Sequence, residues 1–285
     1  MSYLSHIHRC NNCDLAGFQP WSIDGRRVGY IHRELAWRLR DYGSVFDVSH
    51  ETVALRDDLV DPGERTRAVD EVLEGLRSDG LVQSSRNEPY AVVEYPGDVP
   101  LMCLDRSAVT VFGTLATGFH MNGTIGNGPD RYMWIARRSL DKTTFPGMLD
   151  NIVAGGQPAD ISIAQNVIKE CHEEADIPEE LSLQAHPVGL ISYTMHDYGG
   201  LHRHVMYLYD LSLPIDFQPN PRDGEVESFR LLPINEVARI VRTDFDAFKF
   251  NCNLAIIDYL IRHGDIAPGH PEYFDLVTGL HGEIA

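Results

Sequence analysis

The stretch Gly155-Gly156-Gln157-Pro158-Ala159-Asp160-Ile161-Ser162-Ile163-Ala164-Gln165-Asn166-Val167-Ile168-Lys169-Glu170-Cys171-His172-Glu173-Glu174-Ala175 joins a glycine turn to a segment with helical periodicity. Ser162 and Gln165 have the spacing of a capping box, and Pro178 follows the last periodic residue. The sequence therefore predicts a helix over residues 163–176. An apolar stripe that is expected to pack inward consists of Ala164, Val167, Ile168, Cys171 and Ala175.

Three carboxylates share another side of this helix. Glu170, Glu173 and Glu174 have the i, i+3, i+4 spacing that brings side chains together, and like charges so placed cost roughly a few tenths of a kcal/mol per pair. A hard cation removes this repulsion. Mg²⁺ prefers carboxylate oxygens and takes its remaining ligands from water and substrate phosphates. The helix therefore predicts a site for Mg²⁺, or for Mn²⁺ in its place, with a solvated acidic face as the alternative.

Other segments extend this pattern, namely Arg137-Arg138-Ser139, Pro146-Gly147-Met148-Leu149-Asp150 and Asp223-Gly224-Glu225-Val226-Glu227-Ser228-Phe229. With them the chain resembles the Nudix hydrolases. The family signature runs Gly, five residues, Glu, seven residues, Arg-Glu, an aliphatic residue, any residue, Glu-Glu, any residue, Gly and an aliphatic residue. Gly155 falls on its first Gly, whereas Ile161, Lys169 and Asp176 replace the early Glu, the Arg and the closing Gly. The first two changes look linked, because those two side chains lie close together in the family.

The resemblance extends to a Nudix branch with an extra N-terminal domain, whose members are often labelled thiamine-pyrophosphokinase-related. The matching pieces include Trp134-Ile135-Ala136-Arg137-Arg138-Ser139, residues 146–156, Tyr209-Asp210-Leu211 and Ile261-Arg262-His263-Gly264. The patterns predict helices over residues 64–77 and 247–263 in addition to the acidic helix, and several strands, the first long one over residues 111–121. These elements place helices on both sides of a mixed sheet. The resemblance names this α/β arrangement an α/β/α sandwich. We expect it over residues 105–285, preceded by a small α+β domain over residues 1–104.

The resemblance also implies roles for individual residues. The metal ligands would be Glu170, Glu173, Glu174 and the carbonyl of Gly155. The general base would be Glu173, Glu225 or Glu227. Substrate binding would involve Arg137, Arg138, Gly156 and Lys169. Because neighbouring residues of a strand point to opposite faces, we expect one of the two arginines to reach the phosphates and the other to form a surface ion pair.

Composition narrows the class of partner. The 285 residues contain 24 Lys and Arg against 42 Asp and Glu, a net charge of -18 that argues against nucleic-acid binding. No apolar run approaches the roughly 18–20 residues needed to span a membrane, and the first residues lack the features of a signal peptide. We therefore expect a cytoplasmic protein. The five cysteines indicate reduced thiols.

Two further segments attract attention. His6, His8, Cys10 and Cys13 are too crowded to close a zinc tetrahedron, so we expect no zinc site there. Residues 196–204 are polar and contain two glycines, which indicates a flexible connection in preference to a substrate-recognising lid.

The favoured function is the metal-dependent hydrolysis of a small organic diphosphate to a monophosphate. By resemblance, that diphosphate would be thiamine diphosphate or a damaged analogue. An ADP-ribose or nucleotide-sugar pyrophosphatase is the nearest rival. A thiamine-diphosphate-related kinase and a non-catalytic binding module remain alternatives, although the chain has no Gly-x4-Gly-Lys phosphate loop. We expect a homodimer, because proteins with such folds commonly form symmetric dimers.

Overall fold

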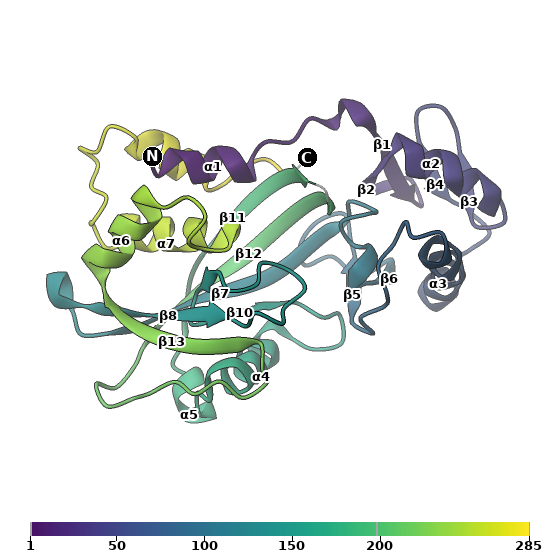
Figure 1. Ribbon diagram of the computed structural model, residues 1–285. Coiled ribbons are helices and arrows are strands. Elements are labelled where there is room, and N and C mark those ends of the chain that lie inside the picture. The colour runs from purple at the N-terminus through teal and green to yellow at the C-terminus, as the bar shows by residue number, and fades with distance from the viewer. Residues whose placement is uncertain (1, 198, 285) are drawn as a thin grey trace.

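The computed structural model describes residues 2–197 and 199–284. Its N-terminal part contains a small sheet with the strand order β2-β1-β4-β3 (Figure 1). The elements here are β1 (Phe18–Ile23), β2 (Arg26–His32), α2 (Arg33–Leu39), β3 (Phe46–Val48), β4 (Val53–Leu55) and α3 (Pro62–Ser78). Asp24 and Gly25 connect β1 to β2 with positive φ angles of 51° and 72°, as a tight hairpin turn requires. Asp61 caps α3 by accepting a hydrogen bond from the Glu64 backbone N–H at 3.0 Å.

The C-terminal part is built on a larger sheet whose main path runs β11-β12-β7-β8-β13. Its strands are β7 (Leu115–Ile125), β8 (Tyr132–Arg138), β9 (Leu149–Asp150), β10 (Val153–Gly156), β11 (His186–Asp197), β12 (Gly200–Ser212) and β13 (Val226–Pro233). Strand β12 pairs with β7 in parallel, whereas β10 pairs with β7 and β13 with β8 in antiparallel. The sheet is therefore mixed, as the sequence predicts.

Helices cover both faces of the larger sheet (Figure 1). On one face lie α4 (Ile163–Ala175) and α5 (Glu179–Ser182). On the other lie α1 (Leu4–Cys10), α6 (Ile234–Thr243), α7 (Phe250–Arg262) and α8 (Tyr273–Gly279). The side chains of β7 alternate between the two faces: Phe119 and Met121 join the core beneath α4, whereas His120 faces Cys252 of α7. This layering is the α/β/α sandwich expected from the sequence.

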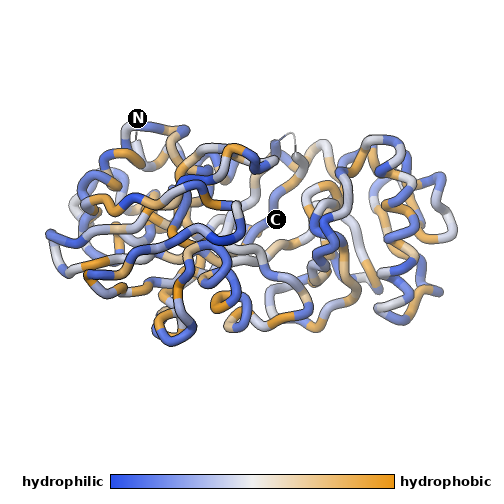
Figure 2. Tube along the Cα trace, turned by 60° about the horizontal axis from the view of Figure 1, so that its bottom comes forward, coloured by the Kyte–Doolittle hydropathy of each residue, from blue (hydrophilic) through white to orange (hydrophobic). Residues whose placement is uncertain are grey.

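The first helix crosses over to the C-terminal part. Tyr3, Ile7 and Cys10 are buried in the core formed with α7, although the following strands belong to the small sheet. A separate core fills the N-terminal part, and Figure 2 shows apolar stretches in both halves of the molecule. The division of the chain at residue 104 stays a prediction.

A two-stranded hairpin lies between the small and the larger sheet (Figure 1). It consists of β5 (Pro89–Val92) and β6 (Met102–Asp105). The backbone N–H of Ala159, just before α4, donates to the carbonyl of Pro89 at 2.8 Å. The hairpin is thereby attached to the segment that leads into the acidic helix.

Several expected element limits need correction. The strand expected from residue 111 begins at Leu115, because 3-10 and turn structure occupies residues 106–113. The described residues of the segment 196–204, which was expected to be a connection, largely belong to strands β11 and β12, and Asp197 pairs with Gly200. Residue 198 lies outside the described residues. Short 3-10 turns lie at Leu15–Gly17, Arg40–Tyr42, Arg106–Ala108 and Gly128–Asp130.

Candidate functional site

A partly enclosed pocket of about 240 Å³ lies between the larger sheet and the N-terminal part of the chain. One side is lined by Glu174 of α4 and by Gly155 and Gly156 at the end of β10. Tyr90 and Arg106, which come from the β5–β6 hairpin and the turn after it, line the opposite side. The pocket therefore combines residues that are far apart in the sequence.

Helix α4 brings the acidic residues to this pocket. The side chain of Ser162 accepts a hydrogen bond from the Gln165 backbone, and the Gln165 side chain accepts one from the Ser162 backbone at 3.0 Å. This is the capping box that the sequence predicts. The helix ends at Asp176, whose φ of 54° is left-handed, the conformation that the Gly of the Nudix signature adopts without strain.

Glu174 is the most deeply buried carboxylate of the helix. It is 9% exposed, and its Oε2 accepts a hydrogen bond from the backbone N–H of Ala154 at 2.9 Å. Burial, and next the negative charge of Glu170, raise the pKa of Glu174 well above its ordinary value. A carboxylate with one backbone donor and a like-charged neighbour would be stabilised in its ionised form by a cation.

Glu170 lies beside Glu174 at the glycine turn. A Cβ at Gly155 would lie 2.7 Å from Cγ of Glu170, so only glycine permits this close approach. Burial also raises the pKa of Glu170, although Lys169 acts in the opposite direction. Glu170 and Glu174 therefore lie side by side next to the glycine turn, as the helical spacing predicts.

Glu173 and Lys169 lie nearer to solvent. Nζ of Lys169 donates to Oε1 of Glu170 at 3.1 Å and to Oε2 of Glu173 at 2.8 Å, and the Glu173 side chain is 44% exposed. Ile161 offers no carboxylate to Lys169, since it replaces the early Glu of the signature. Lys169 therefore pairs with the acidic residues of its own helix.

Glu225 and Glu227, the loop carboxylates considered as bases, lie in different surroundings. Glu225 lines the pocket and forms an ion pair with Lys142. Burial alone would raise its pKa, but Lys142, Arg106 and Arg138 lower the pKa overall, so that Glu225 is ionised at neutral pH. Glu227 instead forms an ion pair with Arg137 at 3.2 Å, and both side chains are at least 40% exposed.

The two adjacent arginines diverge, as strand geometry requires. Arg138 lines the pocket, but its Nη1 donates to Oδ2 of Asp150 at 2.8 Å and its Nη2 to the carbonyl of Thr144 at 2.8 Å. Lys169 and Arg137 are absent from the described pocket lining, whereas Gly156 is part of it.

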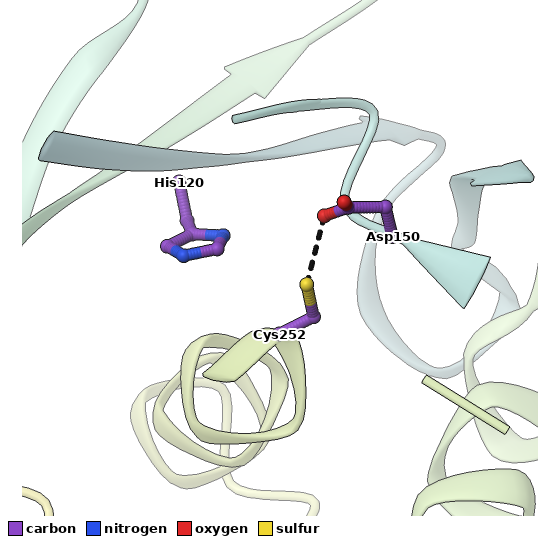
Figure 3. A group of neighbouring side chains, drawn as sticks. All are labelled: His120, Asp150 and Cys252. Atoms are coloured by element: carbon purple, nitrogen blue, oxygen red, sulfur yellow. Dashed lines mark hydrogen bonds between the residues drawn. The ribbon is translucent and has the colours of Figure 1, made fainter. Parts of the chain in front are cut away.

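A second group of ligand-type side chains consists of His120, Asp150 and Cys252 (Figure 3), of which His120 also lines the pocket. Their donor atoms lie within 4.8 Å of one another. Oδ1 of Asp150 accepts hydrogen bonds from Sγ of Cys252 at 2.8 Å and from the Asn151 backbone at 2.9 Å. Burial would raise the pKa of Asp150, but Lys249 and Arg138 lower it overall. This carboxylate is therefore already neutralised by protein groups.

Several pocket residues belong to no recognisable sequence motif. Tyr90 and Arg106 belong to no pattern that indicates a site, and His202 and His204 lie in the segment interpreted as a connection. In the structure these histidines belong to β12 and line the pocket. His204 Nδ1 lies 2.7 Å from the hydroxyl of Tyr193, which fixes the ring. Alternation along β12 was the available signal, because it places residues 202 and 204 on one face.

Of the four side chains weighed as zinc ligands at the N-terminus, His6 and Cys10 contact other parts of the chain. His6 Nε2 lies 2.7 Å from the carbonyl of Val241, and Cys10 is buried against Phe250. Among the described residues, no metal-type cluster includes them. Nor does any helix in residues 2–197 and 199–284 have the length and apolar character to cross a membrane.

In this α/β/α sandwich, an acidic residue of α4 faces cationic groups across the pocket. Such an arrangement is typical of hydrolases that act on phosphate anhydrides. The model of the NUDIX domain matches residues 123–253, and that of a domain of unknown function, DUF4743, matches residues 2–116. The chain is 42% identical to Nudix hydrolase 24, chloroplastic, of Arabidopsis thaliana over 98% of its own length and 77% of that protein. It is 41% identical to Nudix hydrolase 20, chloroplastic, of the same plant, again over 98% and 77% of the two chains. The chain belongs to the Nudix hydrolase family.

Among solved structures, the fold is similar to that of a MutT protein from Methanosarcina mazei, with 13% identity and a TM-score of 0.40. The match covers 51% of this chain and 92% of that one. The two Arabidopsis relatives and the match to the NUDIX domain identify the chain as a Nudix-type hydrolase, and the family implies pyrophosphohydrolase activity on nucleoside diphosphate derivatives, generally with divalent metal ions.

Proposed function

We propose that this protein hydrolyses a small organic diphosphate to a monophosphate with the help of a divalent cation bound at α4. The observation that carries the proposal is the pair Glu170 and Glu174, two neighbouring carboxylates whose pKa values burial raises, with Glu174 on the wall of the pocket. Keeping such groups ionised without a cation is costly, because the protein interior solvates charge poorly.

The residues fit a hard cation. Glu170 and Glu174 would supply oxygens, and Glu173, which is more exposed, would supply a further one. Gly155, whose backbone lies close to the Glu170 side chain, would contribute its carbonyl. Mg²⁺ and Mn²⁺ suit this all-oxygen set, and they usually keep waters and bind substrate phosphates. When bound, the ion would withdraw charge from phosphorus and lower the pKa of a water molecule.

The residues of the chain divide the remaining tasks. We assign proton acceptance to Glu225, since it is ionised and lines the pocket, whereas Glu227 pairs with Arg137 outside it. Water attacks one phosphorus, a new P–O bond forms, and the bridging P–O bond breaks. The water proton passes to Glu225, and the leaving phosphate oxygen takes a proton from solvent. Lys142 would balance the charge that develops on the phosphate oxygens.

Pocket size favours a small substrate. The volume of about 240 Å³ lies below the roughly 300–1,000 Å³ of typical ligand sites. Phe145 and Phe250 line one part of the pocket and offer faces for a heterocycle. We propose thiamine diphosphate or a damaged analogue, which the sequence resemblance also implies. ADP-ribose and nucleotide sugars are the rival substrates.

A substrate panel tests this proposal. Purified protein with Mg²⁺ or Mn²⁺ is offered thiamine diphosphate, its oxidised forms, ADP-ribose, nucleotide sugars and dinucleotides, and the released monophosphate is measured. We expect turnover of at least one small diphosphate, and a loss of about 10³-fold or more in Glu174→Gln. Full activity in a folded Glu174→Gln variant would contradict the metal assignment. Turnover confined to dinucleotides would contradict the small substrate.

We also propose that the protein is cytoplasmic and that it forms a homodimer. The two Arabidopsis relatives are named as chloroplastic, which is a statement about those proteins. Cell fractionation checks the location, and light scattering of the purified chain checks the oligomer.

A further inference from the structure

The domain of unknown function, which matches residues 2–116 and so includes Tyr90 and Arg106, lies against the glycine turn of the pocket. A Cβ built on Gly156 would lie 1.7 Å from the hydroxyl oxygen of Tyr90 and 3.8 Å from Cζ of Arg106. The glycine at position 156 therefore allows the hairpin to touch the loop that precedes α4. The contact is held by the 2.8 Å backbone hydrogen bond from Ala159 to Pro89.

Arg106 is held in position within its own domain. Its Nη1 donates to Oε2 of Glu88 at 2.7 Å, and its guanidinium lies 5.9 Å from the centre of the Tyr90 ring. Asp105 begins the 3-10 turn that presents Arg106, and its carboxylate accepts hydrogen bonds from the Ser107 backbone at 2.9 Å and from Ser85 at 2.6 Å. The turn is thus braced from both sides.

Arg106 retains the capacity to bind a ligand. A guanidinium has five N–H donors in a planar fork, and Glu88 accepts from one of its nitrogens. The side chain is 43% exposed and lines the pocket. It also lowers the pKa of Glu225, which places its positive charge close to that carboxylate across the pocket. A phosphate between α4 and the hairpin would lie within this field.

We propose that the N-terminal domain completes the substrate site within the same chain. Arg106 binds a phosphate of the diphosphate, and Tyr90 covers the glycine turn and holds that phosphate against the acidic helix. This inference rests on the proposed function and assigns a task to the domain of unknown function that precedes the NUDIX domain.

The test compares Arg106→Ala and Arg106→Lys with a matched control in the full-length protein. Arg38→Ala is the control, because Arg38 belongs to the same domain, forms ion pairs with Asp41 and Asp79, and is similarly exposed at 47%. The measurements are kcat and KM for the diphosphate that turns over best, and the dissociation constant of inorganic pyrophosphate with Mg²⁺ by calorimetry.

We expect Arg106→Ala to raise KM and the pyrophosphate dissociation constant by about 10- to 100-fold, the usual loss for a hydrogen bond to a charged group. kcat should change by less than about threefold, because the interaction is made equally in the ground and transition states. Arg106→Lys keeps the positive charge but loses the planar fork of donors. Its KM and its pyrophosphate dissociation constant should therefore lie between those of Arg106→Ala and of the unmodified protein. Arg38→Ala should match the unmodified protein.

Equal constants for Arg106→Ala, Arg38→Ala and the unmodified protein would overturn the inference. If Arg106→Ala fails to fold, Arg106→Lys and Arg106→Gln decide, since both preserve most of the side-chain volume. Absence of turnover on every diphosphate would overturn the proposed function, whereas the pyrophosphate arm would still decide the role of Arg106.

Discussion

Glu174 and Asp150 are buried carboxylates near the same pocket, and their surroundings differ. Asp150 is 6% exposed and bonds to Arg138, Cys252 and the Asn151 backbone. Glu174 is 9% exposed, bonds to the Ala154 backbone, and has Glu170 as its charged neighbour. The pKa of Asp150 is accordingly lowered, by Lys249 and Arg138 against burial, whereas the pKa of Glu174 is raised, chiefly by burial.

The difference shows that proximity of ligand-type atoms is a weak criterion for a metal site. His120, Asp150 and Cys252 lie close enough to share an ion (Figure 3), but the charge of Asp150 is already compensated. Among the described residues, Glu170 pairs with Lys169, which lies on the solvent side of the helix, and Glu174 has no ion-pair partner. An additional cation therefore stabilises the second group more than the first.

The largest expected effect is on stability and separates the two carboxylates. Asp150→Asn leaves the Arg138 guanidinium without its buried partner and should lower the free energy of unfolding by about 3–5 kcal/mol. Glu174→Gln keeps an oxygen that accepts from Ala154 and removes a buried charge, so the change should stay within about 1 kcal/mol. Urea denaturation at pH 7 without divalent metal measures both. Equal losses in the two variants would remove the distinction.

The next effect concerns the stability of the protein at acidic pH and depends on His120, which lies beside Asp150. Burial, and next Lys249, lower the pKa of His120 from 6.5 to about 4. The unfolded chain binds a proton on this imidazole below about pH 6.5, whereas the folded chain binds it only near pH 4, so stability falls as the pH decreases through this window. Relative to His120→Gln, the protein should lose about 3 kcal/mol between these values.

Chemical denaturation of both proteins at closely spaced pH values checks this expectation. His6 and His204, whose pKa values are also lowered by burial, contribute to the slope of both proteins and cancel in the difference. Parallel curves for the two proteins would mean that His120 is protonated without penalty in the folded state.

A smaller effect tests whether the group in Figure 3 binds the metal. Cys252→Ser preserves a donor to Asp150 but buries a more polar group than a thiol, so it should cost about 1 kcal/mol of stability. The Mn²⁺ concentration that gives half-maximal activity should remain within about twofold of the unmodified value. A tenfold increase in this concentration would indicate that His120, Asp150 and Cys252 bind the metal. It would contradict the assignment of the metal to Glu170 and Glu174.

Local patterns predicted the fold well where a single segment decides the outcome. The capping box at Ser162 and Gln165 and the apolar spacing of α4 define that helix without reference to the rest of the chain. The helices expected over residues 64–77 and 247–263 are likewise found as Pro62–Ser78 and Phe250–Arg262. Helix α1 was missed, because its seven residues contribute their apolar face to a core that forms with distant helices.

The pocket was less predictable, because its walls depend on how the domains pack. The spacing of Glu170 and Glu174 brings them to one side of α4, but no local pattern indicates that Tyr90 would meet Gly156. Strand alternation predicts that Arg137 and Arg138 diverge, yet it cannot show which of them bonds to Asp150. The assignments of catalytic, metal-binding and substrate-binding residues stay predictions.

The smallest effect concerns the end of the acidic helix. Asp176 replaces the closing Gly of the signature and has a φ of 54°, a conformation that strains most residues and that glycine adopts freely. Asp176→Gly should relieve this strain and lose the exposed 2.7 Å ion pair with Arg222, for a net gain of about 0.5 kcal/mol. Asp176→Asn, which keeps the side-chain shape, isolates the contribution of the ion pair.

Thermal unfolding measures the stability of both variants. Their hydrolytic rates should equal that of the unmodified protein, because the substitution lies at the helix end and leaves Glu170 and Glu174 in place. A tenfold change in rate would show that this departure from the signature alters the metal-binding side of α4 and not only its termination.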